Sequence, residues 1–229
     1  IKGEVFKPTE RIKVYILEVK STSKGPKILV SRTHPDLVKR LFEKEVAEIQ
    51  DGTVEIKNIV REAGSRTKMA VWSNDKNVDP VGACVGLNGA RVNAIVNDLK
   101  GEKIDIINWN EDPCVFIENA LSPSKVVSVA VDVEEKSAEV VVPDYQLSLA
   151  IGKEGQNARL AARLTGYKID IKSESQAAEE AAKVSEEPET DEFEIEEDLF
   201  NEEINDDFVE DTENTEEAVE DFDAEDIEE

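Results

Sequence analysis

Apolar and polar positions along residues 1–175 switch repeatedly between a period of two and a period of three to four, and each switch marks a new element. Residues 11–20 alternate at first and predict a strand, and residues 27–31 predict a second strand after a turn at 21–26. Because a two-stranded hairpin is only marginally stable alone, we expect these strands to complete a sheet whose other strands precede Ile1.

From residue 33 onward the pattern predicts two units with the same order of elements. Thr33 or Asp36 is available to cap the first helix, while Asp79, Asp112 and Asp144 stand at the start of later ones. In the first unit we expect a helix with Leu37, Val38, Leu41, Phe42 and Val46 on one face, strands at 54–61 and 67–73, a short helix from Pro80, a helix at 90–99 and a strand at 103–109. In the second we expect a helix over 113–121, strands at 126–132 and 137–143, a short helix ending at Ile151, a helix at 156–165 and a strand at 168–172.

Two short glycine pairs lie at equivalent places in the two units, between the short helix and the next one. They are Gly86-Leu87-Asn88-Gly89 and Gly152-Lys153-Glu154-Gly155, and their first glycines are 66 positions apart (152 − 86). The repeat extends further, because Lys103-Ile104-Asp105-Ile106 matches Lys168-Ile169-Asp170-Ile171 after a one-residue gap. Such self-similarity predicts two copies of one domain of about 65–75 residues.

Each glycine pair is placed to bring backbone amides close to an anion. A helix begins directly after it, and helix N-termini favour anions through unpaired N–H groups and the helix dipole. Lys153 lies inside the second loop, while Arg91, Arg159 and Arg163 lie within about two helical turns of their loops and are able to add charge or stack on bases. The competing interpretation is that the glycines only let two helices meet at a tight turn. Neither GxGxxG after a strand nor a P-loop pattern occurs, so no nucleotide cofactor is expected.

The formal net charge of −26 is distributed unevenly. Residues 174–229 contain 28 Asp and Glu against one Lys, a net charge of −27, which leaves 26 basic and 25 acidic residues in 1–173. We therefore expect a nearly neutral folded part followed by a disordered acidic tail at 176–229. Phenylalanines are scattered through this tail, and three interpretations stay open: a solvated tail, one that docks on another protein, and one that mimics RNA and covers the glycine loops.

Other side chains favour structural interpretations. Trp72 and Trp109 end strands and are expected to pack rather than to stack on bases, and His34 has no catalytic partner at a recognisable spacing. Cys84 and Cys114 form neither a metal-binding motif nor a disulfide framework, so we expect a reduced, cytoplasmic setting. No apolar run approaches the roughly 18–20 residues of a membrane span. We expect no membrane association, no metal, no cofactor and no enzymatic activity.

The order of elements around each glycine pair resembles the prokaryotic (type II) KH domain, in which a GxxG loop clamps about four nucleotides of a single strand. More specifically, Asp79-Pro80-Val81-Gly82-Ala83-Cys84-Val85-Gly86 and residues 142–162 resemble the tandem KH region of the NusA family of bacterial transcription factors. Residues 3–35 resemble the end of that family's OB-type RNA-binding barrel. The resemblance implies an α+β fold with the last strands of a partial OB-type β-barrel at 1–33, KH domains at 34–110 and 111–175, and the disordered acidic tail at 176–229.

The resemblance also implies a function, the binding of nascent RNA in a way that modulates RNA polymerase pausing, termination and antitermination. Its implied partners are single-stranded RNA, RNA polymerase and other elongation factors, and the protein is expected to be a monomer. The implied contacts with RNA are Gly86, Leu87, Asn88, Gly89, Arg91, Gly152, Lys153, Glu154, Gly155, Asn157, Arg159 and Arg163. Family members commonly carry a basic residue where this chain has Asn88, so the second loop is expected to be the stronger phosphate contact. The alternative is a protein-interaction scaffold whose KH units have lost RNA binding and whose acidic tail recruits a partner.

Overall fold

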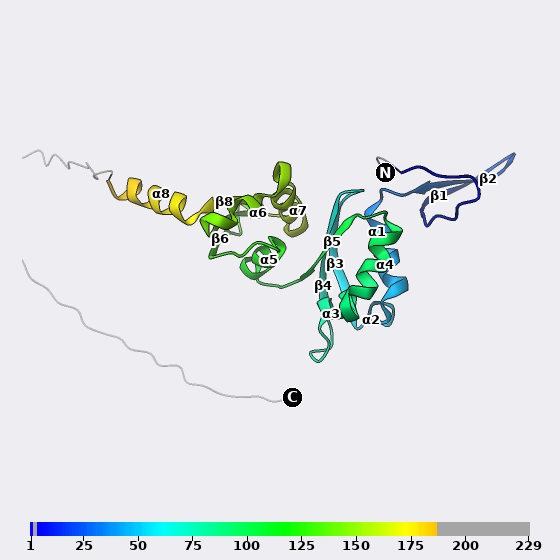
Figure 1. Ribbon diagram of the computed structural model, residues 1–229, viewed down its shortest axis with the longest axis horizontal. Helices are drawn as coiled ribbons and strands as arrows, with labels where there is room; N and C mark the ends of the chain where they lie inside the picture. Colours follow the sequence, from blue (N-terminus) through cyan, green and yellow to red (C-terminus); the bar gives the residue numbers. More distant parts are fainter. Residues whose placement is uncertain (2–3, 187–229) are drawn as a thin grey trace, which may run out of the picture. The chain divides into compact units, whose positions relative to one another are not determined.

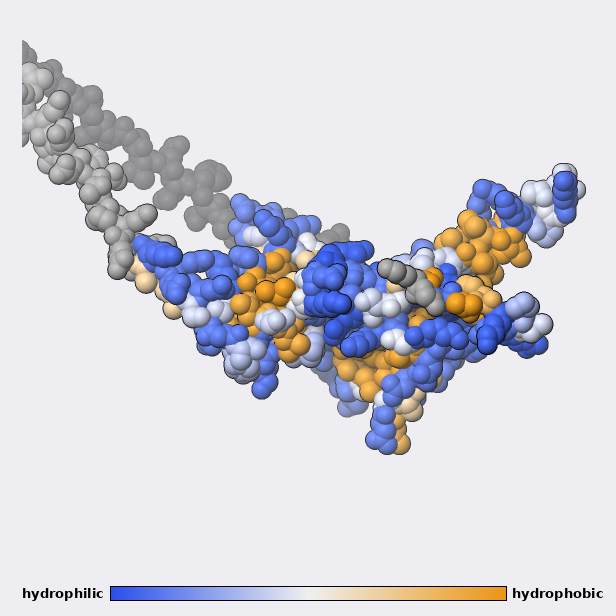
Figure 2. Space-filling view, turned by 45° about the horizontal axis from the view of Figure 1, so that its top comes forward, coloured by the Kyte–Doolittle hydropathy of each residue, from blue (hydrophilic) through white to orange (hydrophobic). Residues whose placement is uncertain are grey.

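The computed structural model describes residues 1 and 4–186, which begin with an extended segment and a two-stranded sheet. Strands β1 (Tyr15–Thr22) and β2 (Gly25–Ser31) pair antiparallel, as the pattern of this region predicted. Apolar side chains on these strands are exposed, and Figure 2 shows them gathered along the arm that the two strands form. They are Ile16, Leu17, Val19, Ile28, Leu29 and Val30. The OB-type barrel stays a prediction, because β1 and β2 form a sheet of their own.

Two α+β units follow, and each contains a three-stranded sheet of the same topology. The elements of the first unit are α1 (Pro35–Glu45), α2 (Ala47–Gln50), β3 (Val54–Glu62), β4 (Arg66–Ser73), α3 (Pro80–Val85), α4 (Ala90–Asp98) and β5 (Lys103–Asn108). Those of the second unit are α5 (Pro113–Ala120), β6 (Ser128–Asp132), β7 (Ser137–Val142), α6 (Leu147–Ile151), α7 (Gln156–Thr165) and β8 (Lys168–Ser173). In the orders β3-β4-β5 and β6-β7-β8, the first two strands are antiparallel and the third is parallel to the second. The predicted repeat is confirmed.

Helix starts are only partly as predicted. Asp79 and Asp112 cap α3 and α5, where each carboxylate accepts hydrogen bonds from amides of the first turn. The first helix is instead capped by His34, whose Nδ1 accepts a hydrogen bond of 3.2 Å from the Asp36 amide. The expected cap at Thr33 or Asp36 is therefore wrong, because the imidazole nitrogen takes the place of the usual oxygen acceptor.

The chain after the second sheet forms a helix, α8 (Glu174–Glu186), where we expected disorder from residue 176 onward. Four alanines in its sequence account for the difference, because alanine has the highest helix propensity. The helix is fastened at its start, where Asp144 accepts a hydrogen bond of 2.5 Å from the Ser175 hydroxyl. The prediction that Asp144 caps the helix before the second glycine loop is therefore wrong. The rest of the predicted tail, residues 187–229, lies outside the described residues.

The first sheet is covered by apolar side chains on both faces, because successive residues of a strand point to opposite sides. Met69 and Val71 of β4 belong to a core with α1, α3 and α4, whereas Ala70 between them belongs to a second core with α5, α6 and α7. Val60 of β3 and Ile107 of β5 join Ala70 in that second core. Figure 1 shows helices on either side of this sheet. The second unit thus uses the first unit's sheet as one wall of its own core.

A buried ion pair ties β3 to the turn before β5. The side chains of Arg61 and Glu102 have no solvent exposure, and hydrogen bonds of 2.8 and 2.9 Å join them. Arg61 also donates to the carbonyl oxygens of Arg32 and His34, and Glu102 accepts from the Gly64 amide. Burial alone raises the pKa of Glu102, but the hydrogen bonds from Arg61 and its neighbours outweigh burial, so the pKa lies below its ordinary value.

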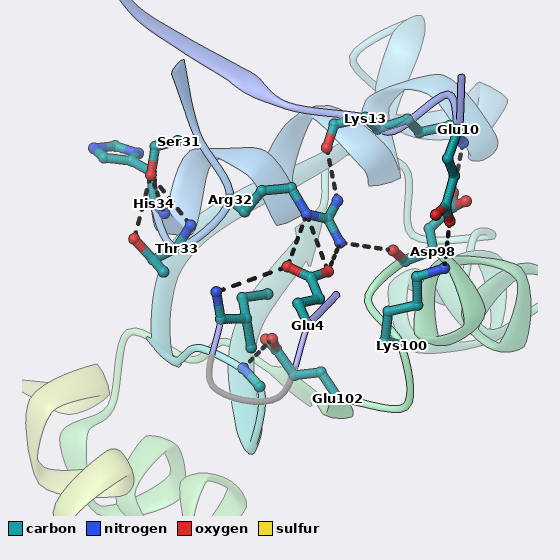
Figure 3. Close-up of polar contacts among 12 residues, drawn as sticks. Glu4, Glu10, Lys13, Ser31, Arg32, Thr33, His34, Asp98, Lys100 and Glu102 are labelled. Atoms are coloured by element: carbon teal, nitrogen blue, oxygen red, sulfur yellow. Dashed lines mark hydrogen bonds and ion pairs between the residues drawn. The ribbon is translucent and has the colours of Figure 1, made fainter. Parts of the chain in front are cut away.

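Arg32 joins the N-terminal segment to the first unit, as Figure 3 shows. Its guanidinium group pairs with Glu4 and donates hydrogen bonds of 2.6 and 3.2 Å to the carbonyl oxygens of Lys13 and Asp98. Since Arg61 holds the Arg32 carbonyl, the two arginines form one polar network between the N-terminal segment, β3 and the end of α4.

We predict that Glu102→Gln lowers the free energy of unfolding by about 3–5 kcal/mol, because it leaves Arg61 buried without a counter-charge. Urea unfolding of the variant and the parent protein measures this. Because the pKa of Glu102 is lower in the folded protein than in the unfolded chain, where it is about 4.3, the ionised carboxylate stabilises the fold fully above that pH. The difference in free energy of unfolding between the parent and the variant should therefore shrink as pH falls below about 4.3.

The matched control is Glu10→Gln, which removes an exposed pair with Lys100 at 3.4 Å. Exposed pairs contribute about 0–1 kcal/mol, so this variant should unfold almost like the parent. Equal losses from the two substitutions would show that the buried pair does not hold the fold.

Candidate nucleic-acid interface

The two glycine loops have the same backbone conformation. Gly86 and Gly152 have φ/ψ of 73°/173° and 74°/173°, and the third residues, Asn88 and Glu154, have 52°/27° and 53°/27°. The last glycines also agree, at 75°/14° and 72°/15°. Since the two loops share only their glycines in sequence, the glycine positions determine the loop shape.

Glycine is required at the first position of each loop. A positive φ with ψ near 173° is a region that glycine alone occupies readily. In addition, a Cβ on Gly152 would lie 2.9 Å from the backbone nitrogen of Asn157, and a Cβ on Gly86 would lie 2.8 Å from Cγ of Arg91. Each loop therefore packs directly on the first turn of the helix that follows it.

The helices that follow the loops begin without a side-chain cap. Helix α4 starts after Gly89 and α7 after Gly155, and neither glycine has a side chain to accept hydrogen bonds from the first-turn amides. The turn before each helix satisfies the first amide, because Ala90 N–H donates to the Leu87 carbonyl oxygen and Gln156 N–H donates to that of Lys153. The start of each helix still carries the partial positive charge of the helix dipole. Each loop thus leads into a helix start that no side chain caps, and anion binding at these starts stays a prediction.

Side chains inside the loops face solvent, but the two loops differ in chemistry. Leu87 is 85% exposed, and Asn88 beside it is exposed as well. In the second loop Lys153 and Glu154 are exposed, and Arg163 is exposed further along α7. The first loop presents an apolar and a neutral polar side chain, whereas the second presents two opposite charges near a further cation.

Two of the arginines predicted to contact RNA are engaged within the protein. Arg91 donates hydrogen bonds of 2.9 Å to the Glu48 carboxylate and 2.6 Å to the Ala83 carbonyl oxygen. The Nε atom of Arg159 donates a hydrogen bond of 2.8 Å to the Glu62 carboxylate, and its Nη1 atom donates one of 3.1 Å to a carbonyl oxygen of the second loop. Arg159 therefore supports the backbone of the second loop, whereas Arg91 joins α2 to α3.

Asn157, also predicted to contact RNA, is only 2% exposed. Its amide group donates hydrogen bonds of 3.0 Å each to the carbonyl oxygens of Leu121 and Ala150, and its Oδ1 has no hydrogen-bond partner among the described residues. The side chain joins α7 to the ends of α5 and α6 beneath the second loop. We therefore correct the prediction for Asn157, which is a buried structural residue and not part of the exposed surface.

Apolar side chains flank the second loop. Tyr145 is 77% exposed, and Leu149 and Ile151 of α6 are exposed as well. Apolar and aromatic surfaces beside a phosphate-binding loop are suited to stack on bases. The apolar face of α6 could not be predicted from the sequence, because a helix of five residues is too short for its exposed face to be assigned from the pattern.

Trp72 and Trp109 pack against each other, as expected. Their ring centroids are 5.5 Å apart in an edge-to-face arrangement, and Trp109 also contacts Phe116 of the second core. His34 stacks on Tyr15 with centroids 4.7 Å apart. Across residues 1 and 4–186, no cluster of His, Cys, Asp and Glu is arranged to hold a metal ion, and no helix combines the length and apolar character of a membrane span.

Both units match known KH domains. The model described as the NusA-like first KH domain matches residues 32–109, and that of the NusA-like second KH domain matches residues 113–179. With two such domains in series, the chain is a tandem KH protein. It belongs to the NusA family, which confirms the resemblance inferred from the sequence.

Relatives named "Transcription termination/antitermination protein NusA" are highly similar to the chain. The one from Bacillus subtilis is 67% identical over 177 residues, which cover 77% of this chain and 48% of the relative. The one from Halalkalibacterium halodurans is 65% identical over 177 residues, which cover 77% and 46%. The chain thus spans about half the length of these relatives. A solved structure titled "Crystal structure of APE1850" aligns with a TM-score of 0.44 at 22% identity, over 59% of this chain and 95% of its own.

We predict that Gly152→Asn lowers the free energy of unfolding by about 1–3 kcal/mol, because asparagine does not tolerate the φ/ψ of this position. Gly155→Asn should cost much less, since asparagine readily adopts the left-handed conformation of that position and a Cβ there meets nothing within 4 Å. Urea unfolding of the two variants compares them directly. A larger loss from Gly155→Asn would contradict the loop geometry.

Proposed function

We propose that this chain is the RNA-binding part of a transcription factor that acts in termination and antitermination. The observation that carries the proposal is the pair of matching GxxG loops, each with solvent-facing residues and an uncapped helix start, in a chain of the NusA family. A GxxG loop of a KH domain clamps about four nucleotides of a single strand. Two loops together hold about eight nucleotides of nascent RNA.

In this proposal the second loop supplies most of the charge. The amides at the start of α7 and the ammonium group of Lys153 contact phosphates, Arg163 adds a further positive charge, and Tyr145 offers a surface for a base. In the first loop the amides at the start of α4 contact the RNA backbone, while Leu87 packs on a base or sugar and Asn88 adds no charge. The second loop therefore contributes the more salt-dependent part of the affinity.

RNA polymerase and other elongation factors are the proposed protein partners. Support comes from family membership and from the names of the relatives, which are transcription termination/antitermination proteins. The protein then acts as a monomer in the cytoplasm, and its role is binding rather than catalysis. Its effects on pausing, termination and antitermination follow from holding nascent RNA close to the polymerase.

A second candidate function is a protein-interaction scaffold. Residues 1–173 carry a net charge of only +1 (26 basic and 25 acidic residues), and Arg91 and Arg159 are held by carboxylates of the protein itself. The pair β1 and β2 also exposes apolar side chains. These observations favour contact with a protein surface over contact with a polyanion. The two candidates differ in the salt dependence of RNA binding.

The test replaces the central residues of one loop and keeps its glycines. We expect the double variant Lys153→Asp with Glu154→Asp to bind an eight-nucleotide single-stranded RNA at least about tenfold more weakly than the parent chain, because it replaces a phosphate contact by a repelling charge. The corresponding variant of the first loop, Leu87→Asp with Asn88→Asp, should also bind more weakly. Fluorescence anisotropy at several salt concentrations measures the affinities.

The matched control is Glu135→Asp with Lys136→Asp in the turn between β6 and β7. It makes the same change in net charge, and Lys136 has a φ of 51° that aspartate tolerates. This variant should bind RNA like the parent chain. Equal, weak and salt-insensitive binding by all four proteins would reject RNA binding and leave the scaffold function.

A further inference from the structure

A cleft lies between the first unit and the second GxxG loop. Its volume is about 340 Å³, and its walls come from both units. The first unit contributes Ser65 and Arg66 at the start of β4 and Lys103 at the start of β5. The second contributes α6, the start of α7, and Gly152 and Lys153 of the loop itself. The loop is therefore flanked by side chains that belong to the other KH domain.

The cleft is cationic. Three of the residues that line it are basic and none is acidic. Arg66 is held by Asp105 through hydrogen bonds of 2.6 and 3.0 Å, whereas Lys103 and Lys153 are exposed and have no ion-pair partner within the described part of the chain. Two unpaired ammonium groups in one concave surface attract an anion, and phosphate is the anion that lysine commonly binds as a point charge.

Hydrogen bonds between the two units fix the shape of the cleft. Gln156 donates bonds of 2.7 Å to both the Glu62 carboxylate and the Ser65 hydroxyl, and Arg159 binds the same Glu62. The backbone amide of Lys103 donates to the Ser65 carbonyl oxygen at 3.1 Å. Ser65 is thus held from both units, and the cleft needs no ligand to bring its walls together. Such preorganisation reduces the ordering cost of binding.

The internal repeat provides a lysine that is equivalent in sequence but not in position. Lys103 and Lys168 each begin a Lys-Ile-Asp-Ile strand at the same place in their units, and both side chains are exposed. Only Lys103 lines the cleft, because only the first sheet meets the helices of the following unit on that side. If the cleft contributes to binding, replacing Lys103 should therefore weaken binding, whereas replacing Lys168 should not.

We propose that this cleft is a composite phosphate site, in which Lys103 of the first KH domain and Lys153 of the second bind a phosphodiester of the RNA strand that the second GxxG loop holds. This proposal rests on RNA binding by the loops and adds that the first KH domain supplies a further cation beside the second loop. The first loop, with Leu87 and Asn88 and with Arg91 paired to Glu48, contributes no free cation of its own. One domain therefore completes the phosphate site of the other.

The experiment compares Lys103→Ala with Lys168→Ala in the 229-residue chain, using the same eight-nucleotide RNA. Each phosphate neutralised on a single strand contributes about −0.7 to the slope of log K against log salt, so Lys103→Ala should make that slope about 0.7 shallower. The same relation predicts an affinity about fivefold weaker at 0.1 M salt. Lys168→Ala should change neither quantity, and both variants should unfold like the parent because both side chains are exposed.

The outcomes separate this proposal from the proposed function. If the parent chain binds RNA with a salt-dependent affinity and the two lysine variants have equal slopes, the composite site is wrong and RNA binding by the loops stands. If the parent chain shows no salt-dependent binding, the proposed function fails first. A shallower slope for Lys103→Ala alone supports the composite site.

Discussion

The relative position of the two GxxG loops depends on a single sheet that is packed on both faces. In β4 the buried residues alternate between two cores, with Met69 and Val71 facing the helices of their own unit and Ala70 facing those of the next. Ile107 lies beside Ala70 in the parallel neighbour β5 and faces the same way. Because neither unit can move without exposing part of this shared wall, the two loops have a fixed separation.

Polar contacts on the same face of the sheet reinforce this arrangement and also determine which charges stay free. Asn58 donates a hydrogen bond of 2.6 Å to the Leu164 carbonyl oxygen, and Lys68 donates one of 2.8 Å to the Ser122 carbonyl oxygen. The Glu62 carboxylate accepts a hydrogen bond from Arg159. Basic residues near the second loop are thus partly used to join the units. The exposed lysines of the cleft that have no ion-pair partner in the structure described for residues 1 and 4–186, Lys103 and Lys153, come from both domains, and in the proposed composite site they act together. If both loops bind one strand as proposed, their fixed separation raises affinity through effective concentration.

Local patterns in the sequence predicted the repeat, the order of elements and the loop geometry, because glycine spacing and apolar periodicity act over a few residues. Contacts between distant segments could not be predicted in this way. Nothing near Asn157 in sequence shows that its amide reaches Leu121, and nothing near Arg159 points to Glu62 in the other unit. Residues Thr67 to Val71 are all buried, and a continuous apolar run is typical of a strand covered on both faces. Lys68 interrupts the run, so the pattern did not predict that both faces are covered.

Native-state hydrogen exchange of an Ile107→Ala variant tests the shared sheet most directly. Ile107 is 3% exposed and lies in the second core, although it belongs to the first unit. Removing a buried isoleucine side chain costs about 2–5 kcal/mol, and we expect the amides of α7 to lose protection along with those of β5. Unchanged protection in α7 would contradict the account, because it would show that the second KH domain is stable without the wall that the first one provides.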